Sequence, residues 1–177
     1  MRHVAFIRAV MIGRESLHRE IVLDLFAAAG AGDPKSHLAT GNVSFDLDLA
    51  ALPDLVEEVD DRMTQVVGRR IDSYVRTLDE LRAIDADIIF GQSPFPDSPC
   101  PQVTFFHEPP DLSQWILPHL GRGGRFAVFH VEGREVYSVT REVDGESAAP
   151  GGQLEKVTGQ RATTRAWSTI DHILSKH

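Results

Sequence analysis

His3-Val4-Ala5-Phe6-Ile7-Arg8-Ala9-Val10 forms a dense apolar run near the start of the chain. Because the run is short and lacks a helical apolar period, it predicts a buried strand. A helix is expected next, capped by Ser16 and ended by Gly30 and Pro34, since the apolar residues between them recur at a 3.6-residue spacing. A strand followed by an amphipathic helix begins a layered fold in which the helix covers a sheet.

Residues 36–46 form a second β-like stretch, with Gly41-Asn42 near its middle. That pair marks either a tight hairpin turn or a bulge in one long strand, and the pattern leaves both open. A second helix is predicted over about 49–67, and we interpret its acidic outer face as solvated. A strand at 71–75 and a capping box at Thr77-Leu78-Asp79-Glu80 complete a β-α-β(-β)-α-β-α order.

Residues 92–101 read Gln-Ser-Pro-Phe-Pro-Asp-Ser-Pro-Cys-Pro. Repeated prolines favour extended backbone without ladder hydrogen bonds, so we predict a connector here. It joins an N-terminal α+β lobe, 1–91, to a C-terminal α+β lobe, 102–177, the two packed as one compact unit. The second lobe is expected to contain a strand at 102–107, a helix capped by Asp111 or Ser113 that runs through Leu120, a hairpin of strands 126–131 and 135–139, a helical turn at 153–157 and a last helix at 164–175.

The two halves resemble each other in the order of their elements, although not in their residues. Both orders are typical of the split βαβ, or ferredoxin-like, arrangement. The predicted fold is therefore α+β, with two packed lobes. In each lobe, helices cover one face of a mostly antiparallel sheet.

Charge and hydropathy exclude several classes of protein. Lysines and arginines minus acidic residues give 18 − 26 = −8, so a dedicated duplex DNA binder is not expected. No apolar run approaches the ~18 residues of a membrane span, and Arg8 interrupts the first run too early for a signal peptide. Cys100 is the single cysteine, so no internal disulfide is possible and a cytoplasmic location is expected.

Signatures of common cofactor and catalytic sites are missing from the sequence. It contains no Gly-x-Gly-x-x-Gly after a strand, no P-loop, no nucleophile elbow and no His-Glu-x-x-His. The eight histidines are scattered, so we expect neither a metal nor a cofactor. We interpret Cys100, flanked by prolines, as a connector residue because no neighbouring cation or helix start would activate its thiol.

Two segments offer backbone amides and arginines to an anion. Gly121-Arg122-Gly123-Gly124-Arg125 has the composition of an amide nest, but a helix end followed by a turn explains its glycines, and we favour that interpretation. In the second segment, Thr163 and Thr164 precede the predicted last helix. Their amides, the helix dipole and Arg165 would converge on an anion. Trp167 would stack on an attached base or fill the core.

Several segments carry a resemblance to a known family, and the longest is 154–169, Leu-Glu-Lys-Val-Thr-Gly-Gln-Arg-Ala-Thr-Thr-Arg-Ala-Trp-Ser-Thr. On these residues, and on Thr40-Gly41-Asn42-Val43-Ser44-Phe45, the whole chain resembles the bacterial domain of unknown function 1697 family. The resemblance implies an α+β fold with two sheet-containing parts and no established biochemical role. The family's opening Arg-Gly-Ile-Asn-Val-Gly-Gly reads Arg-Ala-Val-Met-Ile-Gly-Arg at 8–14, which loses an asparagine and two glycines.

Our leading hypothesis is a cytosolic protein that binds a small phosphate- or nucleotide-like anion. The alternatives are a metal-independent enzyme acting on such a ligand and a module that contacts protein or RNA. Arg8 and Asn42 are candidates because polar groups on or beside core strands need partners. The full set of candidate ligand-binding residues is Arg8, Asn42, Lys156, Thr163, Thr164, Arg165 and Trp167.

Overall fold

A computed structural model describes residues 1–14, 16–95 and 100–177 of the chain. These residues form two compact units, Met1–Ala83 and Ile84–His177, each built around its own antiparallel sheet. The α+β fold class with two lobes is therefore confirmed. Residues 96–99 of the expected connector lie outside the described residues, so the connector stays a prediction. Its last two residues, Cys100 and Pro101, belong instead to a strand of the second sheet, where they pair with Thr140 and Val139. No described helix has the length and apolarity needed to cross a bilayer.

The first unit is a ferredoxin-like sheet with the strand order β2-β3-β1-β4, antiparallel throughout. The helices α1 and α2 each connect two strands that point the same way, which is the split βαβ arrangement predicted from the sequence. The elements are β1 (Arg2–Ile7), α1 (Arg19–Ala28), β2 (Gly32–His37), β3 (Asn42–Asp46), the 3₁₀ turn η1 (Leu49–Ala51), α2 (Leu52–Val67), β4 (Ser73–Thr77) and α3 (Leu78–Arg82).

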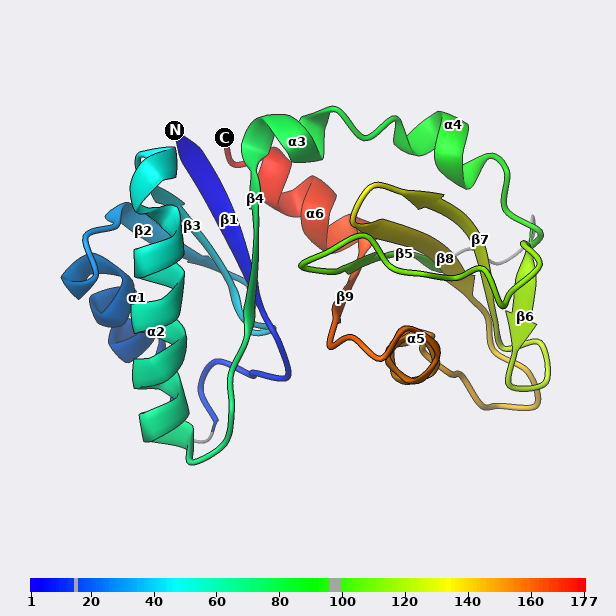
Figure 1. Ribbon diagram of the computed structural model, residues 1–177, viewed down its shortest axis with the longest axis horizontal. Helices are drawn as coiled ribbons and strands as arrows, with labels where there is room; N and C mark the ends of the chain where they lie inside the picture. The colour runs from blue at the N-terminus through cyan, green and yellow to red at the C-terminus, as the bar shows by residue number, and fades with distance from the viewer. Residues whose placement is uncertain (15, 96–99) are drawn as a thin grey trace. The chain divides into compact units, whose positions relative to one another are not determined.

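The core of the first unit lies between the sheet and its two long helices, which Figure 1 shows on the same side of the strands. Alternate residues of β1 and β3, such as Ile7 and Phe45, meet Phe26 of α1 and Met63 of α2. All four side chains are almost completely buried. This packing follows from a sheet period of two and a helix period of 3.6.

The structure decides the alternatives at Gly41-Asn42. Strands β2 and β3 pair directly, with His37 opposite Asn42, so the pair ends a hairpin turn. The predicted cap at Ser16 is wrong, because α1 begins at Arg19 and has no side-chain cap. Leu17 and Arg14 form an isolated bridge that turns the chain before the helix, and Ser16 has a positive φ of 65° within it.

The second unit is a sheet with the strand order β6-β7-β8-β5-β9, also antiparallel throughout. The β7–β8 hairpin turns at Gly133, as predicted, and α5 ends at Gly159 in the left-handed conformation. The elements are α4 (Ala86–Phe90), β5 (Cys100–Phe105), β6 (His119–Gly121), β7 (Phe126–Glu132), β8 (Glu135–Thr140), α5 (Gly151–Thr158), β9 (Thr163–Ala166) and α6 (Trp167–Leu174).

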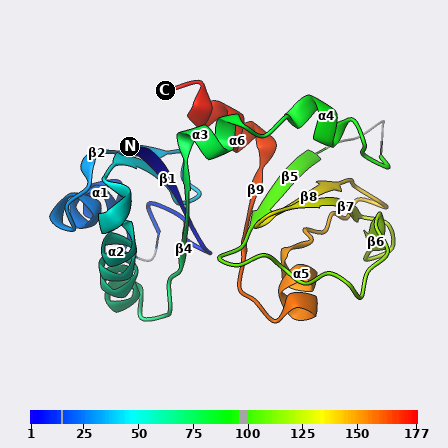
Figure 2. The ribbon, with the colours of Figure 1, turned by 45° about the horizontal axis from the view of Figure 1, so that its top comes forward.

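Helices cover both faces of this second sheet, whereas the sequence pattern predicted one covered face. Leu154 of α5 packs with Phe126 and Val128 on one face. Ala127 and Val139 point to the other face, where Phe90 of α4 packs against them. Figure 2 shows α5 on one side of the strands and α4 and α6 on the other. The apolar residues of adjacent positions in β7 are accordingly buried on both sides.

One predicted helix of the second unit is wrong, and the last predicted helix is present but begins three residues later than expected. Residues 111–120 form a loop and the start of the strand β6 (His119–Gly121), and Pro118 could not have continued a helix into that strand. Residues 163–166 form β9 at the edge of the sheet, paired with β5, and α6 begins only at Trp167. The hydroxyls of Thr163 and Thr164 therefore belong to β-branched strand residues and not to a helix cap.

Candidate functional site

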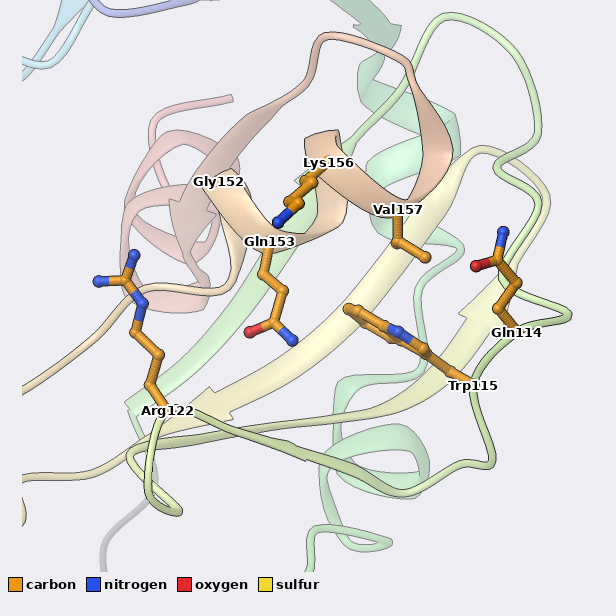
Figure 3. A pocket seen from close by; sticks show the side chains of 7 residues that line it. All are labelled: Gln114, Trp115, Arg122, Gly152, Gln153, Lys156 and Val157. Atoms are coloured by element: carbon orange, nitrogen blue, oxygen red, sulfur yellow. The ribbon is translucent and has the colours of Figure 1, made fainter.

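A pocket of about 540 Å³ opens within the second unit, beside α5. Its walls come from two segments far apart in the sequence, the loop that leads through β6 and the helix α5. Figure 3 shows these side chains around one space, with the Gln153 amide and the Lys156 ammonium directed into it. The described residues that line it are Gln114, Trp115, Arg122, Gly152, Gln153, Lys156 and Val157.

The loop wall of the pocket is anchored at Leu112, a buried residue of the core. The Asp111 carboxylate accepts a hydrogen bond from the Ser113 backbone N–H at 2.9 Å, which lowers the pKa of that carboxyl. The Trp115 backbone N–H donates to the Leu112 carbonyl at 2.9 Å. These two bonds turn the chain so that Trp115 faces α5.

The Trp115 indole is stacked on the His119 imidazole. The ring centroids are 3.9 Å apart and the planes differ by 7°. The side-chain amide N–H of Gln153 donates a hydrogen bond to the Nε2 atom of His119 at 3.2 Å, which leaves the ring proton on Nδ1. The His119 imidazole thus covers one face of the indole, and Gln153 of α5 holds that imidazole in place. This contact limits the rotamers open to the Trp115 side chain.

Arg122 lies in a tight turn between β6 and β7. The N–H groups of Gly124 and Arg125 both donate to the Gly121 carbonyl at 3.1 Å, so the predicted turn is present, but the strand β6 precedes it in place of the expected helix end. Arg122, Gly123 and Gly124 all have positive φ, of 44°, 65° and 76°. An arginine in this conformation is strained, and such strain is concentrated at functional sites. The Arg122 guanidinium stands at the rim of the pocket (Figure 3).

The helix wall of the pocket is provided by Gly152, Gln153, Lys156 and Val157 of α5. Gly152 is in the first turn of α5, where a backbone N–H has no acceptor within the helix. The intervening Glu155 carboxylate accepts a hydrogen bond from the Ala162 N–H at 2.9 Å. The acidic side chain of α5 is thereby tied to the following segment, whereas its lysine faces the pocket.

The electrostatic character of the pocket is positive, although the chain as a whole carries −8. Arg122 and Lys156 supply two cations, and none of the described lining residues is acidic. Within the described part of the chain neither cation takes part in an ion pair. Amides of Gln114 and Gln153 add neutral donors and acceptors. This combination of cations and amides is suited to phosphate or carboxylate groups.

The structure separates the predicted site residues. Of these, Lys156 alone lines this pocket. In the first unit, Asn42 is buried, and its amide donates to the His37 carbonyl at 2.9 Å and to Thr40 Oγ1 at 3.0 Å. It closes the β2–β3 turn. Arg8 follows β1, and its backbone N–H donates to the Asp72 carbonyl at 2.9 Å.

Arg165 is a buried residue of β9. Its guanidinium donates to Thr163 Oγ1 at 2.7 Å and to the Thr164 carbonyl at 2.9 Å. Burial lowers the pKa of Arg165 to about 10. Thr164 Oγ1 is 2.8 Å from Thr104 Oγ1 on β5. The helix start that would have made an anion site here is absent from the described segment, since 163–166 is a strand.

Trp167 is packed against Phe90, with ring centroids 5.7 Å apart. It is therefore part of the aromatic packing around α4 and not a wall of the pocket. Among the described residues, no group of three histidine, cysteine or acidic side chains is arranged to hold a metal ion. Sequence reasoning missed Trp115 and Gln153, and the one signal for Arg122 was the nest-like 121–125 segment.

The fold and the pocket define an α+β protein of two antiparallel sheets, the first of them ferredoxin-like. The chain belongs to the family described as "Protein of unknown function (DUF1697)", which matches residues 1–137, and this confirms the resemblance drawn from the sequence. The pocket side formed by α5 lies beyond the matched residues.

A solved structure shares the fold over nearly the whole chain. The conserved bacterial protein SP0830 from Streptococcus pneumoniae superimposes with a TM-score of 0.63 at 14% sequence identity, covering 99% of this chain and 97% of that one. This likeness shows the fold alone. No curated protein matches the chain.

Proposed function

We propose that this protein binds a small anion carrying a phosphate or carboxylate group in the pocket beside α5. The observation that carries the proposal is the convergence of Arg122 and Lys156 on one cavity whose described lining contains no acidic residue. The same ligand class was the leading hypothesis from the sequence, but of the residues predicted there only Lys156 lines this pocket. A reducing compartment such as the cytosol is the proposed location, because the chain has a single cysteine.

The size of the pocket supports a small-molecule ligand. Its volume of about 540 Å³ lies within the ~300–1,000 Å³ that is typical of such sites. Each charge-assisted hydrogen bond contributes about 1.5–3 kcal/mol, less where solvent screens it, as at the exposed Arg122 and Lys156. Two such bonds, less the cost of ordering both side chains, support dissociation constants from micromolar to millimolar.

The test uses Trp115 as the reporter of binding. The chain has two tryptophans, so the Trp167→Phe variant leaves Trp115 as the single indole. Titration of this variant with inorganic phosphate and pyrophosphate should change the Trp115 emission in a saturable manner. Adding Arg122→Ala or Lys156→Ala should weaken binding about tenfold, because each removes one cation from the pocket.

The matched controls are Arg19→Ala and Lys176→Ala. Both residues are exposed and lie outside the pocket, and each substitution removes one positive charge as the pocket variants do. The controls should bind within twofold of the parent. Equal weakening by pocket and control variants would mean that net charge alone attracts the anion, and the proposal would then be wrong.

A further inference from the structure

We infer that the ligand of this pocket carries a planar nitrogen heterocycle that stacks on Trp115, joined to the phosphate held by Arg122 and Lys156. The inference rests on the proposed function and narrows its ligand class to nucleoside monophosphates and compounds of the same build. Three observations lead to it. They are the size of the cavity, the fixed orientation of the indole and the groups around that indole.

The cavity is larger than an inorganic anion requires. Phosphate fills a small part of about 540 Å³ and would leave the rest to water. The two cations occupy one part of the lining, whereas Trp115 and Val157 form an apolar part (Figure 3). A ligand that uses both parts therefore has a charged end and an apolar end.

The indole is preorganised as a stacking platform. One of its faces is covered by the His119 imidazole at 3.9 Å, and His119 is in turn hydrogen-bonded to Gln153. The indole nevertheless lines the pocket, so part of its surface is open to a ligand. Because the ring is already held, a ligand ring stacks on it with little loss of side-chain freedom.

The polar groups around the indole suit a heterocycle and not a hydrocarbon ring. Gln114 and Gln153 present side-chain amides, each of which has donors and an acceptor for ring nitrogens and exocyclic groups. A single nucleotide is favoured over a nucleic acid chain, because the net charge of −8 opposes the approach of a long polyanion.

The experiment compares four ligands on the full chain carrying Trp167→Phe. They are adenosine 5′-monophosphate, ribose 5-phosphate, inorganic phosphate and adenosine, each titrated against the Trp115 emission and by calorimetry. The monophosphate should bind at least tenfold more tightly than ribose 5-phosphate, and stacking should quench Trp115. Trp115→Ala, studied by calorimetry, should remove that advantage, whereas Trp115→Phe should retain most of it.

The outcomes separate this inference from the proposed function. Equal affinities for the monophosphate and ribose 5-phosphate, with phosphate still bound, overturn the ring inference alone. Failure of all four ligands to bind overturns both proposals. Binding of a 5′-phosphorylated RNA oligonucleotide more than tenfold more tightly than the monophosphate overturns the single-nucleotide assignment in favour of an RNA end. If Trp115→Ala does not fold, the comparison of ligands on the parent and on Trp115→Phe gives the same decision.

Discussion

Arg165 in β9 and Arg122 in the 121–125 turn are two arginines of the second unit with opposite surroundings. Arg165 is buried, and its guanidinium donates hydrogen bonds to Thr163 and Thr164 of its own strand. Arg122 is exposed, stands in a strained backbone conformation and lines a pocket. The sequence around Arg165 looked like an anion site, and the sequence around Arg122 looked like a turn. The difference teaches that the path of the backbone decides whether a guanidinium is available to a ligand.

Replacement of Arg165 should have the largest effect. Arg165→Met keeps the bulk of the side chain but removes the donors to Thr163 Oγ1 and the Thr164 carbonyl. We expect the free energy of unfolding to fall by about 2–4 kcal/mol, because buried polar groups lose their partner. Urea denaturation measures it, with Lys176→Met at an exposed position as the control. A tenfold loss of phosphate affinity without loss of stability would contradict the comparison and return the site to β9.

A partly buried carboxyl, that of Asp60, extends the comparison to the first unit. Asp60 of α2 accepts hydrogen bonds from the Ser73 N–H at 2.8 Å and from Ser73 Oγ at 2.5 Å. Burial raises the pKa of Asp60 to about 6. The folded protein therefore binds a proton more tightly than the unfolded chain, so this group makes stability fall as the pH rises from about 4 to about 6.

Asp60→Asn should remove this decrease of stability with rising pH. Between pH 4 and pH 7 the parent should lose about 2 kcal/mol more of its unfolding free energy than Asp60→Asn does. Urea titrations at several pH values give the two slopes. Glu57→Gln, at an exposed position of the same helix, serves as the control and should keep the slope of the parent. Parallel curves for the parent and Asp60→Asn would show that burial does not govern this group.

The turn that presents Arg122 is sensitive to its backbone conformation. Gly123 has a φ of 65°, and a Cβ atom there would meet no atom within 4 Å, so Gly123→Ala tests conformation without a clash. We expect a loss of about 1 kcal/mol by thermal denaturation. Gly152→Ala is the matched control, because its added Cβ also meets nothing and its φ is not positive. The control should be neutral or slightly stabilising, and a loss at both positions would argue against strain in the turn.

Arg122→Gly should have the smallest effect on stability. Glycine adopts the φ of 44° without strain, and this relief offsets its greater freedom in the unfolded chain. We expect the free energy of unfolding to change by no more than about 0.5 kcal/mol. Phosphate affinity should nevertheless fall about tenfold, as in Arg122→Ala. A large loss of stability would mean that Arg122, like Arg165, stabilises the fold.

Local signals in the sequence predicted most of the first unit. The capping box of Thr77 and Glu80 is present, with the Glu80 N–H donating to Thr77 Oγ1 at 3.0 Å. The apolar period of α2 matches its buried face at Leu55, Val59 and Met63, whereas the buried face of α1 is displaced from the predicted stripe, to Val22 and Phe26. Such signals succeed because capping and helical periodicity involve residues no more than a few positions apart.

The second unit depends more on distant partners, and there the predictions were less complete. Strand β9 pairs with β5, which places Thr164 opposite Thr104, sixty positions away. No pattern within 163–166 predicts this pairing. The pocket has the same origin, because His119 links Trp115 to Gln153, thirty-eight positions further along the chain. Lys156 was found because lysine needs little context to suggest anion binding. Arg122 was set aside because its glycines had a sufficient local explanation.

Gly121 lies between the pocket and the core, and its contact with the core limits how the pocket can be altered. The Phe126 ring lies so close to its backbone that an added methyl group would stand 2.0 Å from the ring. Gly121 therefore lies between Arg122, which lines the pocket, and Phe126, which is fully buried in the core. Anyone who redesigns the pocket for another ligand has to keep this glycine and its aromatic neighbour as a unit, and to seek diversity at Gln114, Gln153 and Val157 instead.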